Sequence, residues 1–172
     1  MFKVVITTKG LANLPRKLAR FRVGILERIP VMLALIGEEI AAIAKQDYLS
    51  GPRSRSKLGV VSGDLRRSIT RGADGNVYRL SGNKLVMGTN LPYAAAHEYG
   101  FHETVQISAH TREVKAVFGR ASGVVRQFVS AHSRKMNLRE RPFLRPAVKD
   151  SLPGARSIIQ RLANEALREA VA

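Results

Sequence analysis

The 172-residue sequence contains no cysteine and no tryptophan, and only 6% of its residues are aromatic. Without cysteine the chain can form no disulfide and can offer no thiolate to a metal. The scarcity of aromatics leaves little for stacking against nucleic-acid bases. No apolar run approaches the roughly 20 residues that span a bilayer, and the apolar N-terminus is too short for a signal peptide. We therefore expect a protein made in a cytoplasm and not inserted in a membrane.

Acidic residues are also few. Thirteen Asp and Glu face 29 Lys and Arg, which gives a formal net charge of +16. A field of this sign favours polyanionic partners such as nucleic acid, an anionic membrane surface or an acidic protein. Composition alone does not distinguish DNA from an acidic protein as the partner.

Apolar residues recur at intervals of three or four from Leu11 to Ile43, which is the period of an α-helix. The pattern stays in phase across Pro30, so it predicts one long kinked helix, or two collinear helices, over residues 11–49. The β-branched residues within 1–8 predict a short strand before it. A small, polar and basic loop over 50–61 follows the helix.

The next part of the chain has the pattern of β-structure. Asp74-Gly75 and Gly82-Asn83 are turn signals, and together with the runs around them they predict a three-stranded antiparallel meander over 62–89. Asn90 then has the position of an N-cap for a short helix over 91–100, which Pro92 begins and Gly100 ends.

Residues 103–138 contain an internal echo. Ser108-Ala109-His110-Thr111-Arg112 recurs as Ser130-Ala131-His132-Ser133-Arg134, and each copy follows a β-rich run. This pattern predicts a long hairpin-like arm whose two legs present similar surfaces. A C-terminal helix over 143–170, broken or kinked near Pro153-Gly154, completes the chain. We expect one α+β domain over 1–172, with an antiparallel sheet packed by a long N-terminal helix and a C-terminal helix, and with an extended β-hairpin arm.

The histidines do not form a recognisable catalytic or metal-binding motif. His97 and His102 are five residues apart, whereas the HExxH zinc motif needs a spacing of four on one helix face. The competing interpretation is that His97 and Glu98 form hydrogen bonds near a helix end while Tyr93 and Tyr99 pack.

A second histidine pair could act across the arm. His110 and His132, with Glu113, could bind a metal or exchange protons if the two legs brought them together. The arginine near each histidine instead favours a surface that faces anions or carboxylates. The alternative to both interpretations is that the two strands of the hairpin simply carry similar side chains facing solvent. We predict no catalytic residue, no metal and no cofactor.

Three short motifs occur in a fixed order after the long helix: Val61 to Ile69, Tyr93 to Gly100, and Arg141 to Ala147. In this combination the chain resembles the tail-completion or neck proteins of long-tailed bacteriophages, a family that includes minor tail protein Z of lambda-like phages. It is similar, more loosely, to virion morphogenesis proteins of Mu-like phages. The family-motif residues are Tyr93, His97, Glu98, Gly100, Arg141, Pro142, Phe143 and Pro146.

The resemblance implies a non-enzymatic virion component at the head–tail junction, assembled in the host cytoplasm as a hexameric ring. Its partners would be further copies of itself, the head–tail connector or stopper, and the tail terminator or tail tube. Genome DNA in the channel is an additional candidate. The alternatives are a basic module that contacts the phosphate backbone of DNA and, third, a histidine-dependent metal hydrolase. The candidate partner contacts are Arg53, Arg55, Arg112, Arg134 and Arg139.

Overall fold

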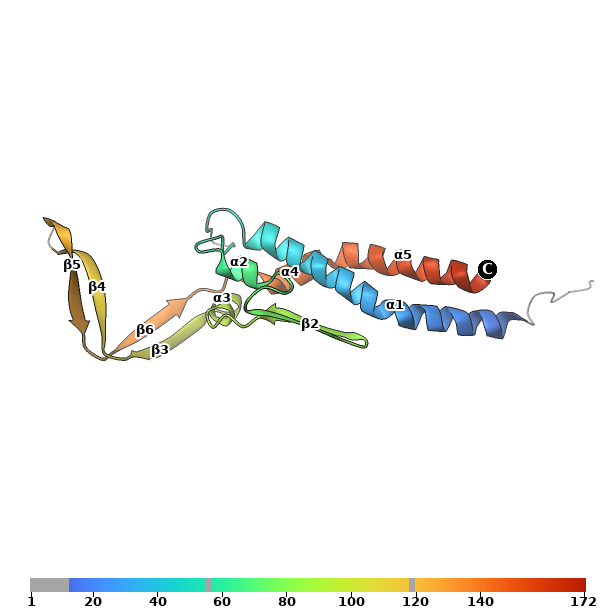
Figure 1. Cartoon of the computed structure of the whole chain (residues 1–172), viewed down its shortest axis with the longest axis horizontal. Helices are drawn as coiled ribbons and strands as arrows, with labels where there is room; N and C mark the ends of the chain where they lie inside the picture. The colour runs from blue at the N-terminus through green and yellow to red at the C-terminus, as the bar shows by residue number, and fades with distance from the viewer. Residues whose placement is uncertain (1–12, 55–56, 118–119) are drawn as a thin grey trace, which may run out of the picture.

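A computed structural model describes residues 13–54, 57–117 and 120–172, with the side chains of 115–125 left aside. It is an elongated α+β molecule with a pair of helices at one end and a β arm at the other (Figure 1). The expected strand over residues 1–8 lies outside the described residues. None of the helices within the described ranges is long and apolar enough to cross a membrane.

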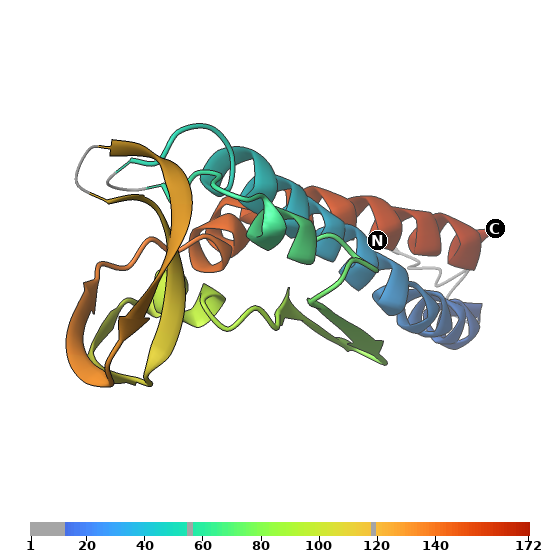
Figure 2. The ribbon, with the colours of Figure 1, turned by 60° about the vertical axis from the view of Figure 1, so that its left-hand side comes forward.

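The long N-terminal helix, α1, runs from Leu14 to Ile43 as one α-helix that contains Pro30. It continues into a short π-helical segment, η2, from Ala44 to Tyr48. The last helix, α5 (Leu152–Val171), lies antiparallel beside α1 (Figures 1 and 2). Small residues allow close approach, because the Cα of Ala166 lies 3.9 Å from where a Cβ on Gly24 would stand.

The C-terminal region consists of two helices, where the sequence predicted a single helix over 143–170. The first, α4, spans Leu144–Asp150, and α5 begins one residue later. The predicted break near Pro153-Gly154 falls instead at Ser151, because Pro153 lies in the first turn of α5, where its missing N–H is not needed.

The prediction of a three-stranded meander over 62–89 is wrong in one strand. Residues Asp64–Ser68 form a short helix, α2, which begins after Gly63 at φ +82°. Leu65 and Ile69 are both buried and are four residues apart, which is helical spacing that we had assigned to a strand. The remaining two strands, β1 (Asn76–Ser81) and β2 (Lys84–Thr89), pair antiparallel around Gly82-Asn83 as predicted.

The short helix α3 spans Ala94–Tyr99 and ends at Gly100, whose φ of +78° suits glycine. Asn90 does not cap it. The backbone N–H of Asn90 instead donates to the carbonyl of Gly75 at 2.8 Å, which closes the base of the β1–β2 hairpin. Pro92 lies before the helix, in a turn.

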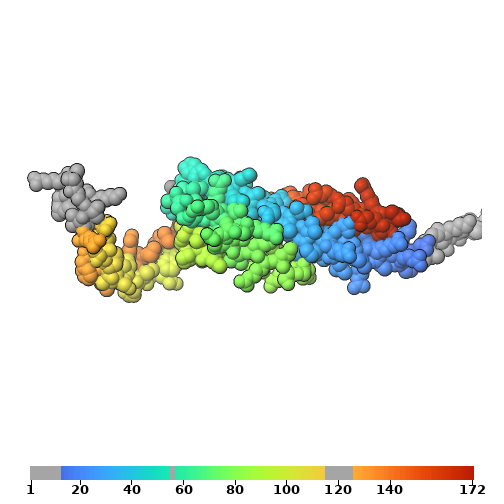
Figure 3. All heavy atoms as spheres, in the orientation of Figure 1, coloured from blue at the N-terminus to red at the C-terminus, as the bar shows by residue number. Residues whose placement is uncertain are grey.

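The arm consists of two successive two-stranded ribbons. Strand β3 (Phe101–Ile107) pairs antiparallel with β6 (His132–Leu138), and β4 (His110–Val117) pairs with β5 (Arg120–Val129). The two ribbons meet at an elbow, where Figure 1 shows the chain changing direction. A space-filling view shows the arm projecting from the body (Figure 3).

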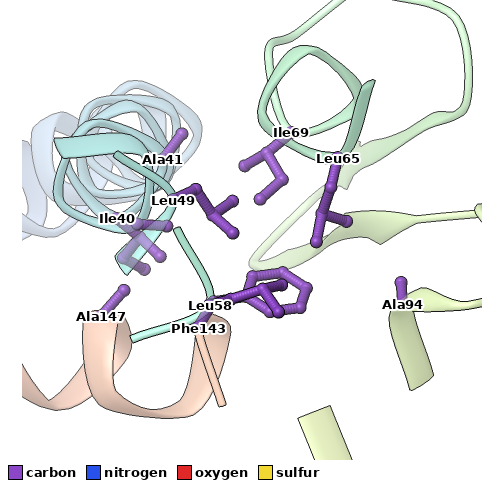
Figure 4. Packing of buried hydrophobic residues seen from close by; sticks show 10 residues of the cluster. Ile40, Ala41, Leu49, Leu58, Leu65, Ile69, Ala94, Phe143 and Ala147 are labelled. Atoms are coloured by element: carbon purple, nitrogen blue, oxygen red, sulfur yellow. The ribbon is translucent and has the colours of Figure 1, made fainter. Parts of the chain in front are cut away.

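The hydrophobic core is small and lies where α1, η2, α2, α3 and α4 converge (Figure 4). Phe143 at its centre is only 1% exposed. The core cluster is made of Ile40, Ala41, Ala44, Leu49, Leu58, Leu65, Ile69, Ala94, Phe143 and Ala147. None of the arm's described side chains belongs to this cluster.

The end of η2 is joined to the end of α4 by one side-chain hydrogen bond. The hydroxyl of Tyr48 donates to Oδ2 of Asp150 at 2.5 Å. This bond, burial and the nearby carboxylates raise the pKa of Tyr48 to about 12. The neutral phenol is therefore the form that the fold favours, and the stabilisation is complete below the ordinary tyrosine pKa and is lost as pH rises through about 12.

We expect Tyr48→Phe to lower the free energy of unfolding by about 1 kcal/mol at neutral pH, since one net hydrogen bond is lost. In a spectrophotometric titration of the native protein, the same substitution should remove an ionisation step near pH 12. Tyr99→Phe, at an exposed position, is the matched control and should leave that step in place. An unchanged titration in Tyr48→Phe would contradict this assignment.

Candidate functional site

The carboxylate of Glu98 joins two of the three sequence motifs, Tyr93 to Gly100 and Arg141 to Ala147. Its Oε2 accepts the backbone N–H groups of Phe143 at 2.8 Å and Leu144 at 3.1 Å, and its Oε1 accepts that of Arg145 at 2.9 Å. Glu98 is 5% exposed, so these bonds form away from water. We call this arrangement of Glu98 with residues 143–145 the clasp.

Local structure explains why the clasp forms. Gly100 ends α3, so Glu98 lies in its last turn and faces the beginning of α4. The first N–H groups of a helix have no partner within the helix, and a negative charge is favoured there by the helix dipole. Pro146 fits the first turn of α4 because proline needs no partner for an N–H. The carboxylate therefore supplies the cap that no side chain at the N-cap position provides.

Arg145 adds a cation to the clasp. Its Nε lies 3.2 Å from Oε1 of Glu98, and its guanidinium also donates to the carbonyl of Glu98 and to Oε2 of Glu140. The hydrogen bond to Glu140, followed by the interactions with Glu98, raises the pKa of Arg145. The guanidinium lies 5.1 Å from the ring centre of Tyr99, within cation–π range.

Arg141 connects the clasp to the loop that follows η2. Its backbone N–H donates to the carbonyl of His97 at 2.7 Å, and its Nε donates to the carbonyl of Ser54 at 3.2 Å. Motif residues from 93–100 and 141–146 thus lie together in the structure. Their contacts are structural: the acceptors of Glu98 are occupied by N–H groups, which leaves this carboxylate unsuited to acid–base work or metal binding.

The echoed segments lie at the elbow of the arm. Nδ1 of His110 lies 3.0 Å from the carbonyl of Ser108, and Nδ1 of His132 lies 2.9 Å from the carbonyl of Ser130. The two sides of the arm therefore bend at the elbow with the same local contact, from a histidine to the serine carbonyl two residues before it. The repeated sequence accounts for this shared geometry.

The histidines of the arm are not paired with one another. His110 is opposite Val129 and His132 is opposite Ile107 in the strand register. Glu113 contacts Arg126 at 3.6 Å and neither histidine. Within the described ranges, no group of three or more histidine or carboxylate side chains is placed to hold a metal ion.

The four candidate contact arginines that the structure describes do not converge. Arg112 donates to Oε1 of Gln127 across the distal ribbon, at 3.1 and 2.9 Å. Arg134 is opposite Val105 on the proximal ribbon, and Arg139 is exposed just after β6. Arg53 is exposed on the body, and Arg55 lies outside the described residues. The arm and the body therefore present separate cationic surfaces.

The proximal ribbon has two different faces. Opposite residues of antiparallel strands point to the same side, so the register assigns each side chain to a face. One face carries the half-buried apolar residues Phe101, Val105, Ile107, Met136 and Leu138, together with Glu103, His132 and Arg134. The other face carries only polar residues: His102, Thr104, Gln106, Ser133, Lys135 and Asn137.

A cavity of about 220 Å³ opens beside His97, on the body. We call it the socket; its lining is mostly apolar and includes Leu49, Leu58, Val60, Val61, Leu65 and Tyr93, with Arg53, Asp64, Arg66 and His97 as the charged or titratable members. Nδ1 of His97 is buried and has no hydrogen-bond partner among the described residues. Burial, followed by the positive charges of Arg53 and Arg141, lowers the pKa of His97.

Sequence reasoning missed the socket, although it contained a signal. Val60 and Val61 lie between Gly59 and Gly63, at the end of the segment that the sequence predicts to be a small, polar and basic loop. Val61 is 91% exposed and forms part of the rim. Two β-branched apolar residues in a surface loop are typical of a contact surface.

Comparisons of the chain with models of known protein families, with curated proteins and with solved structures give no match.

Replacing Glu98 tests the clasp. We expect Glu98→Ala to lower the free energy of unfolding by about 3 kcal/mol, because three backbone N–H groups and Arg145 lose a buried acceptor. Glu98→Gln should cost less, since an amide keeps one acceptor oxygen. The measurement is urea unfolding followed by circular dichroism.

The control for this prediction is Glu103→Ala, which removes an exposed carboxylate from the arm. It should change the stability by no more than about 0.5 kcal/mol. Equal effects of Glu98→Ala and Glu103→Ala would contradict a structural role for the clasp.

Proposed function

We propose that this protein is a structural subunit of a phage neck or tail-completion assembly, which forms a hexameric ring and joins the tail tube to the head connector. The resemblance carried by residues 61–69, 93–100 and 141–147 supports this role. The clasp supports it as well, since Glu98 gives two of these motifs a shared physical purpose. The proposed role needs adhesion between surfaces and no catalysis.

The observation that carries the proposal is the amount of apolar surface left uncovered on the described residues. The arm projects from a small body (Figure 3), and large apolar side chains such as Leu18, Val61 and Phe128 are exposed. Contiguous exposed apolar surface is typical of sites that contact other proteins. A subunit that contacts two or more neighbours accounts for such a shape.

The arm supports the same role. A two-stranded ribbon is marginally stable on its own in water, and one with an apolar face is more stable when another surface covers that face. The exposed large apolar side chains of the helix pair, such as Leu18, Leu26 and Ile159, are further surface available to neighbours. In the proposed ring, the arm reaches a neighbouring subunit while the basic surfaces meet acidic connector, stopper, terminator or tube proteins.

Shortening the arm tests its role in assembly. Residues 108–131 can be replaced by Asn-Gly, because Ile107 and His132 are register partners and this dipeptide favours a tight hairpin turn. We expect the shortened protein to keep its helices and its core but to lose self-association. Circular dichroism and sedimentation velocity measure the two properties. Unchanged self-association of the shortened protein would refute the role of the deleted part of the arm in assembly.

Cryo-electron microscopy of the intact particle tests the location. The proposal expects density for this chain at the head–tail junction, in the virion. Particles in which the protein occurs elsewhere, or not at all, would refute the assignment to the neck.

The net charge of +16 favours a second candidate, a basic module that contacts DNA phosphates. Under this alternative, DNA affinity should fall steeply with salt, with a slope set by the number of phosphates neutralised. Filter binding at several salt concentrations measures the slope. No binding, or binding without a steep dependence on salt, would exclude phosphate contact as a principal role.

A further inference from the structure

Two uncovered apolar features occur on different parts of the chain. The first is the socket on the body, with the exposed rim residues Val60, Val61 and Tyr93. The second is Phe128 on β5, near the elbow of the arm, where the ring is 69% exposed. Large aromatic side chains in well-packed pockets supply much of the energy of protein interfaces, so an exposed aromatic and an open apolar cavity are natural complements.

We infer that Phe128 of one copy of this chain inserts into the socket beside His97 of a second copy. This inference deepens the proposed ring and depends on it for its biological meaning, because it names the surfaces through which one subunit holds the next. The contact is heterologous: the arm of each subunit would occupy the socket of its neighbour, which is the kind of contact that generates a ring.

The sizes agree. The socket encloses about 220 Å³, and a cavity of roughly 150 Å³ accommodates benzene. A phenyl ring therefore fits the socket. Insertion would cover a lining that is mostly apolar, and would remove from water the exposed valines of the rim as well as the ring of Phe128.

The charges around the two features are complementary. Phe128 is opposite Thr111, so it shares a face of the distal ribbon with Glu113 and Arg126. Both of these side chains are largely exposed, and their mutual contact is a loose 3.6 Å. The socket carries Arg53 and Arg66 to meet Glu113, and Asp64, whose carboxylate also contacts Arg67, to meet Arg126. Such pairing sets the register of an interface more than its affinity.

The same chain does not make this contact internally. β5 pairs with β4 in the arm, and the arm projects from the body (Figures 1 and 3). The ring of Phe128 is largely exposed. A second copy can bring its own arm to the socket without bending the first. Folding back of the arm onto its own body is the competing arrangement that the experiment must distinguish.

The absence of cysteine makes site-directed crosslinking unambiguous. One preparation carries Phe128→Cys and another carries Val61→Cys, both in the full chain. The two are mixed and treated with a short bismaleimide, and the products are resolved by mass spectrometry. We expect a crosslinked dimer in the mixture in larger yield than in either preparation alone.

Thr104→Cys replaces Phe128→Cys as the matched control, because Thr104 is exposed on the polar face of the proximal ribbon. It should give little crosslink to Val61→Cys. A chain that carries both Phe128→Cys and Val61→Cys distinguishes the arrangements further: a monomeric internal crosslink that does not change on dilution would overturn docking to a second copy.

An independent measurement uses affinity. We expect Phe128→Ala to raise the dissociation constant for self-association by about 30-fold, as loss of a central aromatic contact does. Thr104→Ala should leave it unchanged. Because Phe128 is exposed, the substitution should not impair folding, which circular dichroism checks.

The outcomes separate this inference from the proposed function. Self-association that is insensitive to Phe128→Ala, with no crosslink to the socket, would overturn the inference and leave the neck role in place. A wild-type chain that stays monomeric at every concentration would overturn it too. Absence of the protein from the head–tail junction would instead refute the neck role, whatever the crosslinks show.

Discussion

The buried carboxylate of Glu98 is the constraint on which the rest of the structure depends. It accepts three consecutive backbone N–H groups at the beginning of α4 and so joins two segments more than forty residues apart in the sequence. Phe143, the central side chain of the core, donates one of these groups. The clasp also sets both ends of the arm, because β3 begins just after α3 and β6 ends just before residues 139–143. A long arm can extend from a small body because the clasp holds the beginning of β3 close to the end of β6.

The body and the arm divide the work that the proposed function requires. The body supplies one well-packed core, whereas the arm, the socket rim and the outer surfaces of the helix pair remain open to solvent. A chain with so much uncovered apolar surface gains stability by contact with neighbours. A high positive charge favours association with acidic partners and speeds their approach, but it does not determine which residues make contact. Binding between surfaces is thus the chemistry that this architecture suits.

Several elements were predictable because their signals are local. The helical period from Leu14 to Ile43, the Gly82-Asn83 turn and the β-rich runs of the arm each predict the element that the structure has. The error over Asp64–Ser68 came from a segment too short for its helical period to stand out against neighbouring turns. The echo at His110 and His132 was visible, but its purpose as a paired bend depends on both strands being in register.

By itself, the sequence determined the α+β class, the excess of positive charge, the absence of disulfides and the position of the motifs, because composition and periodicity are properties of the chain alone. Only the tertiary structure decided that Glu98 is an acceptor for backbone groups, that Arg112 is engaged by Gln127, and that a socket opens beside His97. The physical reason is that hydrogen-bond partners, burial and cavities arise between segments that are distant in sequence. A short motif shows which side chain is present, and the packing of the folded chain decides what that side chain meets.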